Sequence, residues 1–257
     1  MKNRSKIFSL TTFTSFSLVI FIFPLLAATI FSFKGAGGRG YSFDNYLWLL
    51  HQDGFWPSLG TSVKLALLTG VLNIVLMVPT MVFLNLKANN WKPLVDFICI
   101  LPLIIPVVSL AIGAQVAMPK FLQNSQYELV FFFVIISLPY TFRTLDTALS
   151  AVSLLTLVEA SRSLGASWLS TILRVIIPSI RSGIIGTLFL SFALAIGEYT
   201  ITSLLHWDTF PTWTVVAAQQ NILGAVAISI FSFIAAITLM TGVALVPLKK
   251  KRIKESI

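Results

Sequence analysis

Six long apolar stretches occupy most of this chain of 257 residues, and they constrain its fold more than any other feature. A helix needs about 20 mostly apolar residues to cross the hydrocarbon core of a bilayer. The stretches run over residues of about 8–33, 58–86, 93–118, 128–149, 182–205 and 214–248. We therefore expect an all-α polytopic membrane protein with six transmembrane helices, built as a single membrane domain over residues 1–257.

The composition excludes a soluble globular domain. Of the residues, 56% are hydrophobic and 11% are charged, whereas a soluble domain carries about 25% charged residues. The first stretch, 8–33, is longer than the apolar core of a secretory signal peptide, about 7–15 residues, and no A-x-A cleavage site follows it. We expect this stretch to stay in the protein as a membrane helix.

Positive charges fall in alternate connections between the stretches. The net charge is +9, but the basic residues do not gather on one polar face as nucleic acid binding requires, so we expect no nucleic acid partner. Cytoplasmic loops of membrane proteins carry an excess of Lys and Arg. With both termini in the cytoplasm, the cytoplasmic segments hold Lys2, Arg4, Lys6, Lys87, Lys92, Arg143, Arg162, Arg174, Arg181, Lys249, Lys250, Lys251, Arg252 and Lys254. The outer loops hold Lys34, Arg39 and Lys120, so the bias predicts cytoplasmic termini.

The cytoplasmic connection over residues 150–181 differs from the others. Its apolar side chains recur at a spacing of four, at Leu164, Trp168, Ile172 and Ile176, with Leu169 and Leu173 beside them. This pattern predicts an amphipathic helix. Gly165 favours a break between two short helices, and Pro178 fits the first turn of the next membrane helix. The apolar stripe suits either a lipid surface or a partner protein.

The same connection resembles the EAA loop of type I ABC importer permeases. That family's loop reads E-A-A, three residues, G, nine residues, then I-x-L-P. Glu159, Ala160, Gly165 and Pro178 occupy the matching positions. Ser161 replaces the second alanine, and Val175 and Ile177 replace the Ile and Leu of the I-x-L-P segment. Similar segments of the family extend over nearly the whole chain: residues 41–46, TSVKLALLTG, LPLIIP, LPYTFRTLD and AIGEYTITSLL. The similarity is closest to the polyamine, ferric iron, thiamine, sulfate and molybdate branch.

The resemblance implies a type I ABC importer permease fold in the bacterial cytoplasmic membrane. In the family, this loop docks into a separate ATPase subunit, which binds ATP, while an external solute-binding protein delivers the substrate. A second permease subunit, identical or different, completes the pathway. The residues that it assigns to ATPase coupling are Glu159, Ala160, Gly165, Ala166, Trp168 and Pro178. In this interpretation Gly165 sets the turn, Trp168 supplies apolar contact, and Glu159 fixes the loop by capping or an ion pair.

Glu198 lies within the fifth apolar stretch, where an ionisable group is costly unless it is paired or hydrated. As a substrate-path residue with Tyr199, it would suit a polyamine or another small cation. A structural or gating role is the alternative that we favour, and pairing with Lys64 in the second stretch would be one structural role. Pro102 and Pro106 are expected to break or kink the third helix, and kinked helices often line a pathway.

Other motifs in the chain do not indicate a nucleotide-binding site or an enzyme. The chain has no G-x-x-x-x-G-K-[ST] sequence, so ATP would be bound by the partner ATPase. Residues 35–40 match G-x-G-x-x-G but follow a membrane helix rather than a strand, so we expect no cofactor site. His51 and His206 leave metal binding open, though polar residues at an aqueous boundary explain them more simply. We expect no enzyme activity. The rival interpretation is a gated channel or membrane enzyme with an interfacial helix.

Overall fold

The computed structural model describes residues 2–35, 40–123 and 125–245. The described residues form helices and no strand, apart from one isolated bridge between Lys34 and Tyr41. The elements are α1 (Lys2–Ser32), α2 (Asp44–His51), α3 (Phe55–Lys87), η2 (Asn89–Trp91), α4 (Lys92–Ile104), α5 (Val107–Ala117), α6 (Glu128–Ser150), α7 (Leu154–Ser163), α8 (Trp168–Thr171), η3 (Ile172–Ile176), α9 (Ile177–Ser179), α10 (Arg181–Ile196), α11 (Thr200–Leu204), α12 (Phe210–Gln220) and α13 (Ile222–Leu245). The prediction of an all-α protein is confirmed for this part of the chain. Arg39 and the basic residues at 249–254 lie outside it.

The chain divides into two compact units. The first comprises Met1–Trp56 and Trp213–Ile237, and in it Phe55 is fully buried and packs against the rings of Trp213 and Phe231. The Trp213 indole donates to the carbonyl of Asp53 at 3.0 Å. These contacts join the connection after α2 to the part of the chain near α12 and α13.

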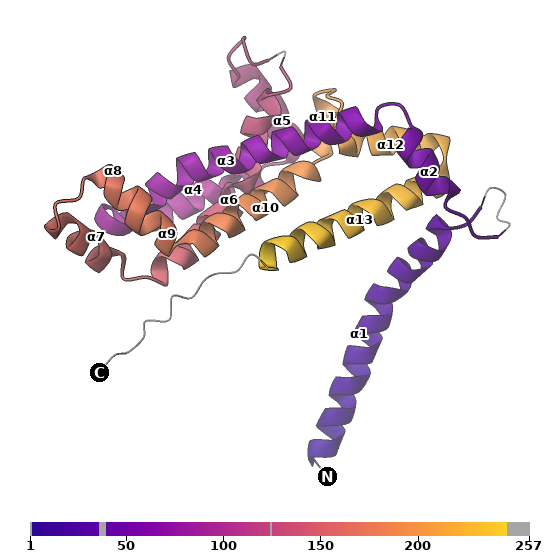
Figure 1. Ribbon diagram of the computed structural model, residues 1–257, viewed down its shortest axis with the longest axis horizontal. Coiled ribbons are helices and arrows are strands. Elements are labelled where there is room, and N and C mark those ends of the chain that lie inside the picture. Colours follow the sequence, from indigo (N-terminus) through magenta and orange to yellow (C-terminus); the bar gives the residue numbers. More distant parts are fainter. Residues whose placement is uncertain (1, 36–39, 124, 246–257) are drawn as a thin grey trace. The chain divides into compact units, whose positions relative to one another are not determined.

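The second unit comprises Pro57–Thr212 and Thr238–Ile257, and most of α3 packs there with α4, α6 and α10 (Figure 1). Glycine permits the close approach of α10 to α6, because a Cβ at Gly183 would lie 2.3 Å from the Ala148 Cβ. Gly70 of α3 similarly faces Leu188 of α10, where a Cβ would lie 2.6 Å from the leucine side chain. Small residues therefore let these helices pack closely, as membrane helices commonly do.

Several of these helices are suited to a bilayer. Among the described residues, α3 and α6 are each long and apolar enough to cross a membrane. The number rises to four if two bent pairs each form one span: Asn89–Ile104 with Val107–Ala117, bent by 104°, and Trp168–Ser179 with Arg181–Ile196, bent by 79°. Shorter apolar helices occur at Leu18–Ser32 and Ile222–Thr238. The length and composition of these helices indicate a membrane protein. The count of six spans stays a prediction.

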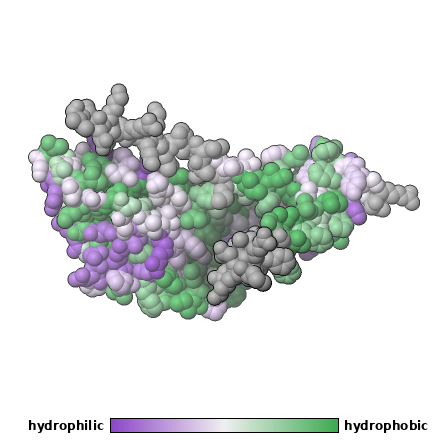
Figure 2. Space-filling model, turned by 90° about the horizontal axis from the view of Figure 1, so that it is seen from below, coloured by the Kyte–Doolittle hydropathy of each residue, from purple (hydrophilic) through white to green (hydrophobic). Residues whose placement is uncertain are grey.

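The surface agrees with this assignment. Figure 2 shows hydrophobic residues over much of one face, and hydrophilic residues gathered toward the end of the view that carries α7 and α8 in Figure 1. Large apolar side chains stand exposed along α3, among them Val71, Val75 and Phe83, each more than half exposed. In water such a surface would be unfavourable, whereas lipid chains can cover it.

Three of the expected helices are interrupted, each at a residue that explains the break. The third breaks at Ile105 and Pro106, as LPLIIP predicts, and Pro102 stays inside α4. The stretch 214–248 breaks at Asn221, whose side-chain oxygen accepts from the Gly224 N–H at 2.9 Å and caps α13. The fifth breaks between α10 and α11, at Glu198.

Candidate functional site

The loop over residues 150–181 forms a helix–turn–helix at one end of the second unit (Figure 1). Gly165 follows α7 with φ +80°, a left-handed conformation that side chains disfavour. The Ser167 hydroxyl then caps α8 by accepting from the Ser170 N–H at 3.3 Å. The predicted break at Gly165 is therefore confirmed.

Hydrogen bonds hold the two arms of this turn together. Ser161 of α7 and Thr171 of α8 are buried, and their hydroxyl oxygens lie 3.0 Å apart. The Arg162 guanidinium donates to the carbonyl of Ala166 at 2.8 Å. Ser161 thus joins α7 to α8. From the sequence, its position was expected only to hold a small residue in place of alanine.

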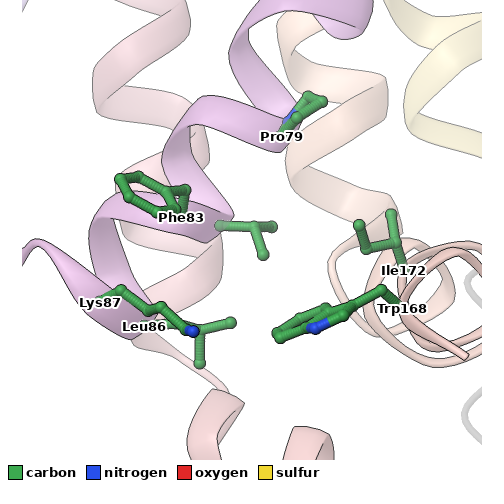
Figure 3. A pocket seen from close by; sticks show the side chains of 7 residues that line it. Pro79, Phe83, Leu86, Lys87, Trp168 and Ile172 are labelled. Atoms are coloured by element: carbon green, nitrogen blue, oxygen red, sulfur yellow. The ribbon is translucent and has the colours of Figure 1, made fainter.

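The apolar stripe of the loop divides between two surroundings. Ile176 is fully buried, and Trp168 and Ile172 line a pocket against α3 (Figure 3). Leu164, Leu169 and Leu173 instead stand 88%, 67% and 54% exposed. These leucines are therefore the most exposed of the apolar side chains in the stripe.

Two predicted details of the loop are wrong. Glu159 is exposed, and its side chain makes no hydrogen bond or ion pair within the described part of the chain, so the expected cap or ion pair is not formed there. Ala160 beside it is also exposed, and Ala166 is half-buried. Pro178 does not begin the next membrane helix, because it lies in α9, which is separated from α10 by the bend. Proline lacks an N–H, and a π-helical turn, in which the Ile177 N–H reaches the Ile172 carbonyl, directly precedes it.

Glu198 caps α11 rather than pairing with Lys64. Its carboxylate accepts from the backbone N–H groups of Thr200, Ile201 and Thr202 at 3.0, 2.9 and 3.4 Å. These N–H groups have no partner inside a helix, because they begin one. Tyr199, which follows Glu198, is 41% exposed.

Lys64 makes a different contact, because its ammonium donates to the hydroxyl of Tyr127. This hydrogen bond is the main reason why the pKa of the Tyr127 phenol lies below its usual value. The predicted pairing of Lys64 with Glu198 is therefore wrong. Two of the substrate-path candidates border helices that contact each other. Pro106 precedes α5, Glu198 caps α11, and α5 packs against α11.

Two buried polar groups, at Glu128 and Asn73, were not predicted from the sequence. Glu128 at the start of α6 is 1% exposed, and its Oε1 accepts from the Trp207 indole at 2.6 Å, while Oε2 has no partner within the described chain. Asn73 of α3 is fully buried and donates to Ser137 of α6 at 2.7 Å and to Ser191 of α10 at 2.9 Å. An amide in the middle of an apolar stretch is a signal that could have identified Asn73.

The histidines lie apart from any cluster of ligands. Among the described residues, no group of three or more His, Cys, Asp and Glu side chains is placed to hold a metal ion. His51 donates from Nδ1 to the Leu47 carbonyl at 2.7 Å, and His206 lies in a turn with φ 58°.

Comparison with known proteins leaves the family assignment a prediction. No protein-family model matches the chain, and no curated protein matches it.

Proposed function

We propose that this chain is the membrane-spanning permease subunit of a type I ABC importer. It would move a small solute, delivered by an external binding protein, across the bacterial cytoplasmic membrane. A separate ATPase would drive it through the loop over residues 150–181. The observation that carries the proposal is the turn at Gly165, because a left-handed glycine lies at the position that the EAA pattern reserves for glycine.

The loop has the properties that a coupling element needs. Its two arms are joined by the buried contact between Ser161 and Thr171, so it can move as one body. Leu164 and Leu169 provide exposed apolar groups that a cleft on a partner could bury. Central, well-buried side chains carry most of the free energy of a protein interface.

Movement of the loop would reach the membrane helices by two routes. Trp168 and Ile172 lie against the last turns of α3. The short elements η3 and α9 lead into α10 through the 79° bend, and α10 packs along α6. Glu198 and its neighbours would then act as structural parts of the path, since a cationic substrate would have to compete with the cap of α11 for the carboxylate.

Co-purification with ABC ATPase subunits tests the proposal. Gly165→Val should abolish recovery of the ATPase, because a β-branched residue is strained at φ +80°. Gly165→Asn should retain it, because asparagine tolerates this conformation. No heavy atom lies within 4 Å of a Cβ at this position, so the two variants differ in backbone strain rather than in collision.

A second pair of variants tests the docking surface. Leu164→Asp should lower ATPase recovery at least tenfold if the side chain is buried at the interface. Phe121→Asp is the matched control, because Phe121 is also exposed, at 80%, but follows α5. A channel or an enzyme with an interfacial helix would bring down no ABC ATPase. Equal recovery with all four variants and normal uptake would contradict the assignment.

A further inference from the structure

An open apolar pocket of about 220 Å³ lies beside the last turns of α3, where α8 approaches it (Figure 3). Pro79, Phe83 and Leu86 of α3 form one side, and Trp168 and Ile172 lie opposite. Phe83 is 58% exposed and Trp168 is 41% exposed, so the pocket opens to the surroundings rather than into the core.

A cation stands at the rim of this pocket. Lys87 is the last residue of α3, and its ammonium makes no ion pair or hydrogen bond within the described chain. A second cation is close by, since the Arg162 guanidinium lies 5.9 Å from the centre of the Trp168 ring. The pocket therefore combines apolar walls with unneutralised positive charge at one edge.

The pocket also lies at one end of a helix that is suited to a membrane. The helix α3 is long and apolar enough to cross a bilayer, and it finishes at Lys87. Trp91, 62% exposed, follows four residues later. Lys at the end of a span and exposed Trp are typical of the boundary between lipid chains and headgroups.

We propose that the pocket binds an anionic phospholipid. An acyl chain would lie against Phe83, Leu86 and Ile172, and the phosphate would meet Lys87. Anionic headgroups attract each Lys or Arg near the membrane surface by about 1 kcal/mol. This inference depends only on the chain's being a membrane protein, so it can hold or fail independently of the ATPase.

Native mass spectrometry of the detergent-purified chain, titrated with phosphatidylglycerol or phosphatidylcholine, tests the proposal. Phosphatidylglycerol should bind more tightly. Lys87→Gln should weaken its binding about fivefold, the factor that corresponds to about 1 kcal/mol. Lys120→Gln is the matched control, because Lys120 is an exposed lysine outside the pocket. Leu86→Trp, which fills the pocket, should weaken the binding of both lipids at the site.

The outcomes separate the possible occupants. Equal effects of Lys87→Gln and Lys120→Gln would overturn the proposal, since they would show attraction to net charge alone. Equal affinity for the two lipids would overturn it as well. If Lys87→Gln left lipid binding unchanged but lowered recovery of an ATPase subunit, the pocket would belong to a protein partner and the proposal would be wrong. Because Lys87 is exposed, its variant should fold, and a melting curve matching the wild-type protein checks this.

Discussion

Glu198 illustrates how a single residue can be misread from sequence. A carboxylate within an apolar stretch indicates either a substrate path or a structural partner, and the sequence offered Lys64 as that partner. The structure gives it main-chain N–H groups instead, at the start of α11. Those donors exist only because the helix breaks at this point, and the break could not be read from an unbroken apolar run.

This cap predicts the effect of removing the carboxylate. Glu198→Ala should lower the free energy of unfolding by about 1 kcal/mol, because three N–H groups lose their acceptor. Unfolding of the detergent-solubilised protein provides the measurement. Glu159→Ala is the control and should leave stability unchanged, because the Glu159 side chain is exposed and makes no hydrogen bond or ion pair within the described chain. Normal stability of Glu198→Ala together with lost uptake would instead identify Glu198 as a residue of the substrate path.

The turn at Gly165 was predictable from the sequence, whereas the surroundings of Trp168 were not. A glycine interrupting an amphipathic pattern predicts a turn through its freedom at positive φ, and the structure has that turn. The four-residue spacing that groups Leu164 with Trp168, however, assumes one continuous helix. Because the helix breaks at Gly165, Leu164 is exposed and Trp168 lies against α3. The predicted stripe therefore does not form one continuous apolar face.

The elements were predicted more reliably than their interruptions. Each of the six apolar stretches contains helix in the described part of the chain, because apolar runs of this length cannot satisfy their backbone groups in lipid otherwise. Breaks at Asn221 and Glu198 depend on side-chain caps, which compete locally with the continuing helix. Only the break at Pro106 had a covalent cause that the sequence displays directly.

The packing of α10 on α6 gives a prediction for these elements. Gly183→Leu should destabilise the chain by several kcal/mol or prevent its folding, because a Cβ at this position would lie 2.3 Å from the Ala148 Cβ. The two positions belong to packed helices, α10 and α6, so neither can shift alone to relieve the collision. Gly113→Leu is the control in α5, since no heavy atom lies within 4 Å of its Cβ position. Yield of monodisperse protein and its melting temperature measure the difference. Equal behaviour of the two variants would contradict the close packing of these helices.

The second unit as a whole has two distinguishable ends. At one end, Lys92 of α4 pairs with Asp146 of α6 and donates to Asn85 of α3 at 3.2 Å. Asp96 and Arg143 form a further pair there at 2.7 Å. This end therefore gathers the close of α3, the start of α4 and the close of α6, three points that the Lys and Arg bias assigns to the cytoplasm.

The opposite end gathers the other set of helix termini. Ser62 of α3 accepts from the Phe210 N–H at 2.8 Å, and Trp207 donates to Glu128 at the start of α6. Ala111 of α5 is buried in the same apolar cluster as Leu65 and Leu129. Cys99 of α4 belongs instead to the cluster with Met81 and Leu149. The chain consequently passes from one end to the other between α4 and α5, which favours a broken span over a re-entrant loop.

This passage predicts the membrane topology around the 104° bend. In a Cys99→Ala background, which removes the chain's single cysteine, cysteines at Asn90 and Ser163 should be protected from an impermeant thiol reagent added outside intact cells. Cysteines at Lys120 and Tyr41 should be labelled. All four positions are exposed, so accessibility of the side chain does not decide the result. A re-entrant loop would place Lys120 on the same side as Asn90, and both would then be protected. Labelling at Ser163 from outside would contradict the orientation itself, because the coupling loop would face away from any cytoplasmic ATPase.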